Sequence, residues 1–407
     1  MSGTQPLHGS LAVFRTAWIV VAIFMLSNAA TPLYSAWQDA LGFSSGVVTV
    51  IFACYIVGLL LTLTVAGQLS DHYGRKALLL PCVVLAIIAA CLFDQAGSIG
   101  VLMFARFLTG VAVGLVVTGG MANVVEHAAP HRKPFASLIA SLAMVAGAGS
   151  GPLLAGVIAQ YCADAIHTVF RIEIVILCIA LLALLNQKNL KLGTGAFKAR
   201  LPKVQNQHLG VVLRGIAFFG PGITSTSFVL SLGPKLIGTF MGVNSPLATG
   251  SMAFAMFFMA VVVQLIAKRF SSRVVFSLSG VATFSSMGVL WIALQTHSVT
   301  WLVVSALLAG AGQGVGQLGG LTLIAQNVPA QRRAEANAIF NMGGYVPAGA
   351  IPVLTGYLID FFGLGVGITS LALIIASLAG AALLMLWRRP PHQVNGAEEA
   401  RRDGIAR

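Results

Sequence analysis

Charged residues are scarce in this sequence. Asp, Glu, Lys and Arg make up only 9% of its 407 residues, and hydrophobic residues make up 57%, whereas a soluble globular protein carries about 25% charged residues. Stretches without any charge include 47–66, 274–296 and 363–387. Each is long enough to cross a bilayer, which takes about 20 apolar residues. The composition therefore excludes an ordinary soluble domain and predicts that most of the chain lies in lipid.

Patterns typical of catalysis, metal binding or nucleotide hydrolysis are missing as well. The sequence has no Gly-x-x-x-x-Gly-Lys-Ser/Thr loop for ATP, no metal-binding helix motif, and no cluster of His, Asp and Glu within the apolar stretches. The five cysteines have neither metal-ligand spacing nor the pattern of a disulfide framework. We therefore expect no enzyme activity, no cofactor and no metal site.

Lys and Arg outnumber Asp and Glu by 24 to 11, but their distribution excludes a nucleic-acid surface. They fall in short segments between the apolar stretches, not beside stacking aromatic residues on one soluble module. With both termini in the cytoplasm, 21 of the 24 lie in cytoplasmic segments, as the positive-inside rule requires. The sequence therefore predicts a multi-pass protein of the cell inner membrane whose N- and C-termini are both cytoplasmic.

The apolar stretches predict an all-α membrane protein with twelve transmembrane helices, because lipid cannot satisfy free backbone N–H and C=O groups. The expected spans are 14–36, 46–68, 77–95, 99–125, 135–160, 166–187, 211–233, 247–267, 274–296, 299–325, 335–360 and 363–387. Four segments follow: an N-terminal six-helix bundle at 1–187, a basic cytoplasmic linker at 188–210, a C-terminal six-helix bundle at 211–389 and a polar cytoplasmic tail at 390–407.

The two halves repeat at an offset of 200 residues. The matching pairs are Gly110 and Gly310, Gly114 and Gly314, Gly119 and Gly319, Gly120 and Gly320, Arg132 and Arg332, Pro152 and Pro352, and Gly156 and Gly356. Seven matches at one offset indicate two pseudo-symmetric bundles. Repeats of this kind are typical of transporters that alternate access to a site near the membrane midplane.

The segment 67–76, Gly-Gln-Leu-Ser-Asp-His-Tyr-Gly-Arg-Lys, resembles the loop signature of the major facilitator superfamily, G-x-L-[SA]-D-x-x-G-R-K, at its usual place after the second span. The resemblance implies that fold and a conformational latch in which Asp71 faces the start of span eleven and Arg75 pairs with Glu126. The latch residues are Gly67, Asp71, Gly74, Arg75, Lys76 and Glu126. The alternative is a solvated loop whose charges only set the orientation of the chain. In the second half, 267–273 has no Asp and no Gly, which argues against a symmetric second latch.

Two charged residues, Arg106 and Glu173, are singled out within the predicted spans because they lie away from the span ends. Arg106 opens the run Arg-Phe-Leu-Thr-Gly in span four, and a charge inside a span is costly and by default functional. The resemblance implies that this arginine takes part in proton coupling; the alternative is an interfacial side chain that reaches out of the membrane. Glu173 in span six is interpreted either as a proton carrier or as the partner of another charge near the outer surface.

Span five carries Gly147, Gly151, Pro152 and Gly156. The pattern resembles g-x-x-x-G-P-x-x-[GA]-G, which is typical of the exporters in the superfamily that exchange substrate for protons. Small residues allow another helix to approach, and a proline bends its helix, so we interpret these residues as a hinge. Generic packing of small residues is the alternative. The motif favours efflux over the second hypothesis, a proton symporter that imports a sugar, organic acid or other metabolite.

Polar and aromatic residues at expected mid-membrane depth predict a cavity between the halves. They are Asn28, Thr31, Tyr34, Phe218, Thr224, Ser225, Gln313, Gln317, Asn341 and Tyr345. Any one of them is also compatible with an ordinary helix–helix contact. As a set they favour a neutral or weakly charged amphipathic molecule. The expected partners are therefore a small-molecule substrate, protons and the lipid bilayer, with no nucleic acid, and we expect a monomer.

Overall fold

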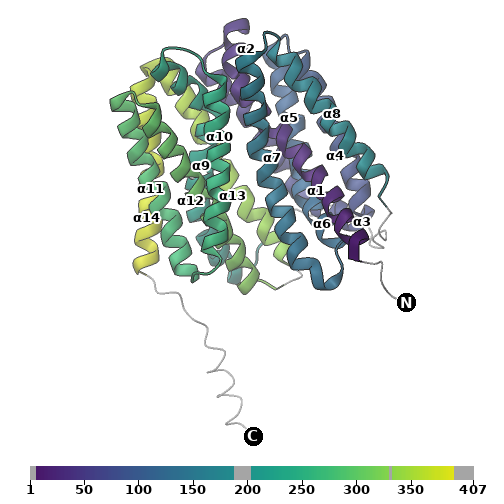
Figure 1. Ribbon diagram of the computed structural model, residues 1–407. Coiled ribbons are helices and arrows are strands. Elements are labelled where there is room, and N and C mark those ends of the chain that lie inside the picture. Colours follow the sequence, from purple (N-terminus) through teal and green to yellow (C-terminus); the bar gives the residue numbers. More distant parts are fainter. Residues whose placement is uncertain (1–5, 188–202, 330–331, 389–407) are drawn as a thin grey trace, which may run out of the picture.

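The computed structural model describes residues 6–187, 203–329 and 332–388 of the chain (Figure 1). Among them, twelve helical segments are long and apolar enough to cross a membrane. The α-helices are α1 (Pro6–Ala29), α2 (Tyr34–Leu41), α3 (Ser45–Tyr73), α4 (Arg75–Asp94), α5 (Ile99–Leu115), α6 (Met121–Glu126), α7 (Lys133–Tyr161), α8 (Ala165–Leu185), α9 (Asn206–Met241), α10 (Pro246–Ala267), α11 (Ser272–Thr296), α12 (Val299–Asn327), α13 (Arg333–Phe362) and α14 (Leu364–Arg388).

Two of the twelve spans are interrupted. In the first, a single 3-10 turn at Thr31–Leu33 separates α1 from α2, and Pro32 there cannot donate a backbone hydrogen bond. In the fourth, a π-helical turn at Val116–Gly120 separates α5 from α6. Such interruptions inside membrane helices are tolerated where neighbouring protein covers the backbone, and both are largely buried.

Most predicted spans agree with the helices to within about five residues, but α1 begins at Pro6, eight residues before the predicted start, and α9 ends at Met241, eight residues after its predicted end. The start of α9 differs as well. This helix begins at Asn206, so the end of the predicted linker, 206–210, is helical and not loop. A helix satisfies its backbone hydrogen bonds by itself, so it continues past the apolar boundary into polar surroundings. Residues 188–202 of that linker and the predicted tail at 390–407 lie outside the described residues.

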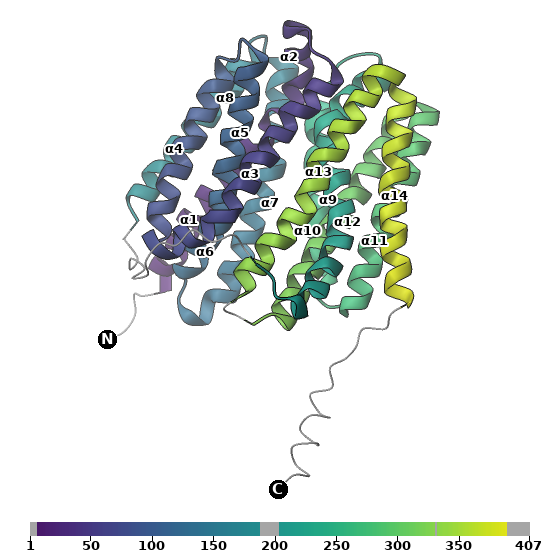
Figure 2. The same cartoon turned by 180° about the vertical axis from the view of Figure 1, so that it is seen from behind.

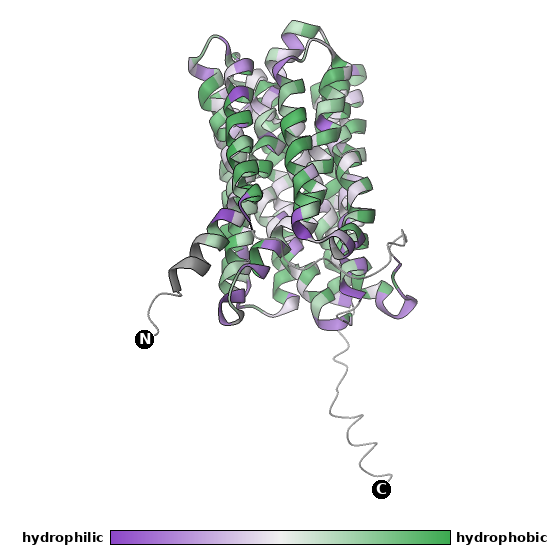
Figure 3. Ribbon diagram, turned by 90° about the vertical axis from the view of Figure 1, so that its right-hand side faces the viewer, coloured by the Kyte–Doolittle hydropathy of each residue, from purple (hydrophilic) through white to green (hydrophobic). Residues whose placement is uncertain are grey.

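The helices form two bundles, α1–α8 and α9–α14, which stand side by side (Figures 1 and 2). Each bundle has a large apolar core of its own. The described chain starts and ends at the same end of the molecule, which we call the terminal end; the other end is the distal end. Hydrophobic residues cover the sides of the helices, and hydrophilic residues gather towards the two ends of the molecule (Figure 3). This distribution fits a protein whose flanks face hydrocarbon.

The sequence repeat corresponds to equivalent helix crossings in the two bundles. A Cβ added to Gly110 of α5 would collide with Tyr55 O of α3, and one added to Gly310 of α12 would collide with Met256 O of α10. In each bundle a glycine therefore lets two backbones approach where any side chain would separate them. The repeated glycines are thus used for the same contact twice.

Candidate functional site

Arg106 lies in the interior of the N-terminal bundle and is fully buried. Its Nη1 donates to the carbonyl oxygen of Ser27 on α1 at 2.5 Å, while Nε and Nη2 have no hydrogen-bond partner among the described residues. The interfacial alternative for this side chain is wrong, because complete burial keeps it from reaching water. A buried guanidinium with unused donors is costly unless another group satisfies it in some state of the protein.

Aromatic rings surround this guanidinium. The Arg106 Cζ lies 5.1 Å from the centroid of Tyr34 and 5.8 Å from those of Phe52 and Phe93. Faces of aromatic rings attract a cation at these distances. The rings therefore offset part of the cost of burying the charge, and Tyr34 also brings a hydroxyl group to the same bundle interior.

Glu173 is the second buried ionisable group of this bundle. Phe93 stacks on Phe170 of α8 with 4.9 Å between ring centroids, and Glu173 follows Phe170 by one helical turn. Its side chain is fully buried, and neither carboxylate oxygen has a partner among the described residues. The alternative that Glu173 pairs with another charge is not observed there. Its near neighbour in the chain, Arg171, instead places Nε 3.8 Å from Asp94 Oδ1.

The signature segment 67–76 forms the last turns of α3, the connecting residue Gly74 and the start of α4. Gly74 has φ +86°, a backbone conformation that side chains rarely adopt. Arg75 Nε lies 3.1 Å from Glu126 Oε1, so the predicted pair is present, and the guanidinium also donates to Ser70 Oγ. The side chain of Asp71 lies outside the described residues, and its contact with α13 stays a prediction.

The structure shows the surroundings of Lys76 and Gly67, and the latch roles of both residues stay predictions. Lys76 Nζ donates to the carbonyl oxygens of Leu185 at 3.0 Å and Gln187 at 2.6 Å, so it caps the end of α8, where unpaired carbonyls attract a cation. A Cβ added to Gly67 would meet nothing within 4 Å. The structure therefore gives no packing reason for glycine at that position.

The small residues of span five face two different helices. Gly147 and Gly151 of α7 lie against the backbone of α1, because an added Cβ would collide with Val21 O and Met25 O. Gly156 lies against α10 of the other bundle, where an added Cβ would be 2.5 Å from Pro246 O. The Pro152 carbonyl in turn lies against Gly250. The motif therefore joins the two bundles as well as packing its own, and bending at Pro152 stays a prediction.

A second crossing between the bundles is related to the first by the sequence repeat. Gly356 of α13, the counterpart of Gly156, lies against α3: an added Cβ would be 2.9 Å from Gly46 Cα and from Ser45 O. The reciprocal addition to Gly46 would place a Cβ 2.8 Å from Tyr357 and from Asp360 Oδ2. These close contacts bring the distal ends of the two bundles together.

Asp360, near the end of α13, binds the first turn of α3. Its Oδ1 accepts the Ser45 N–H at 3.0 Å and its Oδ2 accepts the Gly46 N–H at 2.7 Å. Lys235 of α9 donates to Ser45 Oγ. The unpaired N–H groups and partial positive charge of a helix start favour a carboxylate there. We call Asp360, Ser45, Gly46 and Lys235 the distal clasp. The predicted site residues do not include it, although the sequence shows an Asp at the end of one span and Ser-Gly at the start of another.

The predicted cavity residues are not all free to meet a ligand. Asn28 Nδ2 donates to Ser27 Oγ at 3.1 Å, while Thr224 and Ser225 donate to carbonyls of their own helix at 2.7 and 2.9 Å. Thr31 is fully buried and its hydroxyl has no partner among the described residues. In this state the polar groups of α9 are therefore largely satisfied by helical backbone.

The half-buried polar residues of the C-terminal bundle include Gln313 and Gln317 of α12 and Asn341 of α13. Gln313 Nε2 donates to Gln317 Oε1 at 3.3 Å, and Asn341 Nδ2 donates to Asn337 O at 2.9 Å. Phe218 does not fit the prediction: its ring packs 4.9 Å from Phe276 of α11, in a cluster within the C-terminal bundle. On α9 its position faces α11, away from the other bundle.

Aromatic residues mark the boundary between the bundles. Tyr55, Phe257 and Tyr345 each pack against the cores of both bundles, and the Tyr345 ring lies 6.1 Å from that of Phe219. Of these, the sequence analysis identified only Tyr345. The sequence does not distinguish an apolar residue at the boundary between the bundles from one in the core of a bundle. Tyr55 and Phe257 could therefore not be singled out.

Comparisons with known proteins agree with this architecture. A family model described as Major Facilitator Superfamily matches residues 16–276 and 213–406. The probable multidrug resistance protein EmrY of Escherichia coli (strain K12) is 24% identical over 220 residues, 52% of this chain and 41% of EmrY. The 3-(3-hydroxy-phenyl)propionate transporter of the same organism is 38% identical over 80 residues, 20% of each chain.

Solved structures resemble the whole chain. A POT family transporter in complex with 5-aminolevulinic acid superimposes with a TM-score of 0.72 at 15% identity, covering 95% of this chain and 98% of that one. The sequence alignments with curated relatives span only about a fifth to two-fifths of those relatives' length. Because the family match runs across nearly the whole chain and the fold agrees with it, this protein belongs to the Major Facilitator Superfamily.

Proposed function

We propose that this transporter exports small amphipathic molecules from the cytoplasm in exchange for protons. The observation that carries the proposal is Arg106, a buried guanidinium whose Nε and Nη2 lack a well-formed hydrogen bond among the described residues and which lies beside the Tyr34 ring. A charge kept in such a place at a cost to stability is expected to act in the transport cycle. Glu173, a buried carboxyl group without a described partner in the same bundle, is the second candidate for proton transfer.

The arrangement of α3 and α13 supports alternating access. These helices run in opposite directions, so the distal end of α13 meets the start of α3, and the terminal end of α3 lies towards the start of α13. The distal clasp holds the distal ends together through Asp360. Asp71 is proposed to bind the start of α13 in the opposite state. Two carboxylates at opposite ends of one helix pair would then close the two sides in turn.

The substrate is proposed to bind at the boundary between the bundles, near Tyr55, Phe257 and Tyr345. The rings there favour a molecule with an apolar body and few polar groups. The termini are proposed to be cytoplasmic, and the protein is proposed to act as a monomer. An introduced cysteine within 188–210 should then react with an impermeant maleimide only from the cytoplasmic side.

Import by proton symport is the second candidate. The local similarity to the 3-(3-hydroxy-phenyl)propionate transporter favours it, whereas the span-five motif and the similarity to EmrY favour export. The two directions predict opposite changes in cellular content: an exporter lowers the accumulation of its substrate and an importer raises it.

The test expresses the full chain in a host that lacks its main efflux systems. Cells are loaded with a panel of amphipathic dyes and antibiotics and, separately, with radiolabelled 3-hydroxyphenylpropionate. If the protein exports, cells with the wild-type chain should accumulate less of at least one panel compound than cells without the protein, and a protonophore should reverse this difference. The same result is expected with Arg214→Gln but not with Arg106→Ala. Arg214 is an exposed cation of α9 and serves as the matched control. Protonophore-sensitive uptake of the labelled acid would instead support symport, and protonophore-insensitive transport would exclude both.

A further inference from the structure

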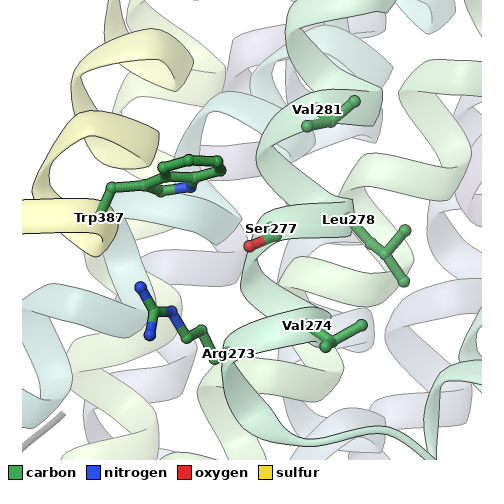
Figure 4. A pocket seen from close by; sticks show the side chains of 6 residues that line it. All are labelled: Arg273, Val274, Ser277, Leu278, Val281 and Trp387. Carbon is green, nitrogen blue, oxygen red and sulfur yellow. The ribbon is translucent and has the colours of Figure 1, made fainter. Parts of the chain in front are cut away.

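A groove lies between α11 and α14 near the terminal end of the C-terminal bundle (Figure 4), and these two helices stand at the side of the molecule opposite to the N-terminal bundle (Figure 1). It has a volume of about 450 Å³ and is lined by Arg273, Val274, Ser277, Leu278, Val281 and Trp387. The exposed fraction of Val281 is 53% and that of Trp387 is 72%. Exposed apolar side chains on spanning helices face lipid, so the groove opens into the bilayer.

The lining of the groove changes in character along α11. Arg273, Ser277 and Val281 are four residues apart and therefore share one face of the helix. Arg273 lies at the start of α11, where the span begins, followed by a hydroxyl group and then by aliphatic side chains deeper in the membrane. Trp387, one residue before the end of α14, lies across the groove from Ser277 (Figure 4). The order cation, hydroxyl, aliphatic is the complement of a phospholipid from phosphate through ester to acyl chain.

The positive charge at this groove is not neutralised by described residues. In the first half, Arg75 pairs with Glu126; the position 200 residues after Glu126 is Gln326, which is neutral. Arg273 forms no ion pair in the part of the chain that the structure describes. Three more cations, Lys268, Arg269 and Arg388, adjoin the same ends of α11 and α14. The start of α11 and the end of α14 therefore present several cations to the membrane boundary, and no ion pair within the described residues compensates that of Arg273.

We propose that this groove binds one anionic phospholipid. The Arg273 guanidinium holds the phosphate, the Ser277 hydroxyl reaches the ester region, and an acyl chain lies along Leu278 and Val281 beside the Trp387 ring. Guanidinium is suited to phosphate because it donates several hydrogen bonds in one plane, and tryptophan is suited to the boundary between water and hydrocarbon. The surrounding cations disfavour lipids whose headgroup also carries an ammonium. A soluble anion would leave the apolar wall uncovered.

The test measures quenching of tryptophan fluorescence in the purified full-length protein by brominated lipids. Phosphatidylglycerol and phosphatidylcholine with the same brominated chains are titrated into the detergent-solubilised protein. The difference between the wild type and Trp387→Phe isolates the signal of the groove. Half-maximal quenching of that signal is expected at an about fivefold lower proportion of phosphatidylglycerol than of phosphatidylcholine, since one basic residue at a membrane surface attracts anionic lipid by about 1 kcal/mol.

Arg273→Gln is expected to abolish that preference, whereas Arg214→Gln, which removes an exposed cation of α9, is expected to keep it. Equal melting temperatures of both variants in detergent alone would show that the fold is intact. Equal quenching of Trp387 by the two lipids in the wild type, or a preference that survives in Arg273→Gln, would overturn the proposal. Displacement of phosphatidylglycerol by millimolar inorganic phosphate would also overturn it, because the groove would then bind the ion and not the lipid.

Discussion

Asp360→Asn should weaken the closure of the distal end. The carboxylate accepts two backbone N–H groups of α3, at 3.0 and 2.7 Å, across the boundary between the bundles. The amide of Asn keeps one acceptor oxygen and turns an NH2 group towards the other N–H. A hydrogen bond to a charged group contributes about 1.5–3 kcal/mol, and the low end applies because Asp360 is exposed. We expect a loss of about 1.5 kcal/mol, which corresponds to a roughly tenfold shift towards the state in which the distal end is open.

The shift can be measured by electron–electron double resonance between spin labels at the distal ends of the two bundles. Exposed Ala40 of α2 and Phe362 of α13 are suitable labelling sites in a chain whose five native cysteines have been replaced. A population that is about 1% open would become about 9% open, and a larger starting population would change more visibly. Asp164→Asn is the matched control, since this exposed distal carboxylate approaches only His167, at 4.0 Å, among the described residues.

An unchanged distance distribution in Asp360→Asn, with an unchanged melting temperature, would refute the reasoning. It would mean that the glycine crossings alone hold the distal ends together. If Asp360→Asn and Asp164→Asn changed the distribution equally, the effect would be one of surface charge and not of the hydrogen bonds.

Four further changes test the other parts of the site. Asp71→Asn should abolish transport while membrane insertion and yield stay at wild-type levels; normal transport would remove the latch from the mechanism. Arg106→Lys should keep the buried charge but lose proton-linked flux, because an ammonium cannot reproduce the planar donors, and wild-type flux measured in vesicles would contradict this. Glu173→Gln should leave the melting temperature within a few degrees of the wild type and abolish the proton movement that accompanies substrate transport; persistence of that movement with a pH-sensitive dye would exclude Glu173 as a carrier. Gly156→Val should destabilise the protein by about 1–3 kcal/mol through overpacking against Pro246 O, while Gly67→Ala, with open space around it, should not lower the melting temperature.

The sequence by itself determined the fold class and the repeat. Charge-free stretches long enough to cross hydrocarbon leave helices as the solution, because an unsatisfied backbone group in lipid is costly. The offset of 200 residues was visible without a structure. It corresponds to equivalent helix crossings in the two halves, one pair at Gly110 and at Gly310 and another pair at Gly156 and at Gly356. The pairing of Arg75 with Glu126 could also be predicted, since it follows a local signature.

Only the tertiary structure decided which side chains are buried and which helices meet. Arg106 could have reached the membrane boundary by its position in the chain, but packing against α1 and three aromatic rings keeps it inside. Phe218 and Tyr345 look alike as aromatic residues in spans, yet one faces α11 and the other the boundary between the bundles. The distal clasp joins residues more than 300 positions apart. Helical periodicity fixes the faces of each helix, but the partner of a face depends on how the bundles dock, and that is a property of the assembled molecule.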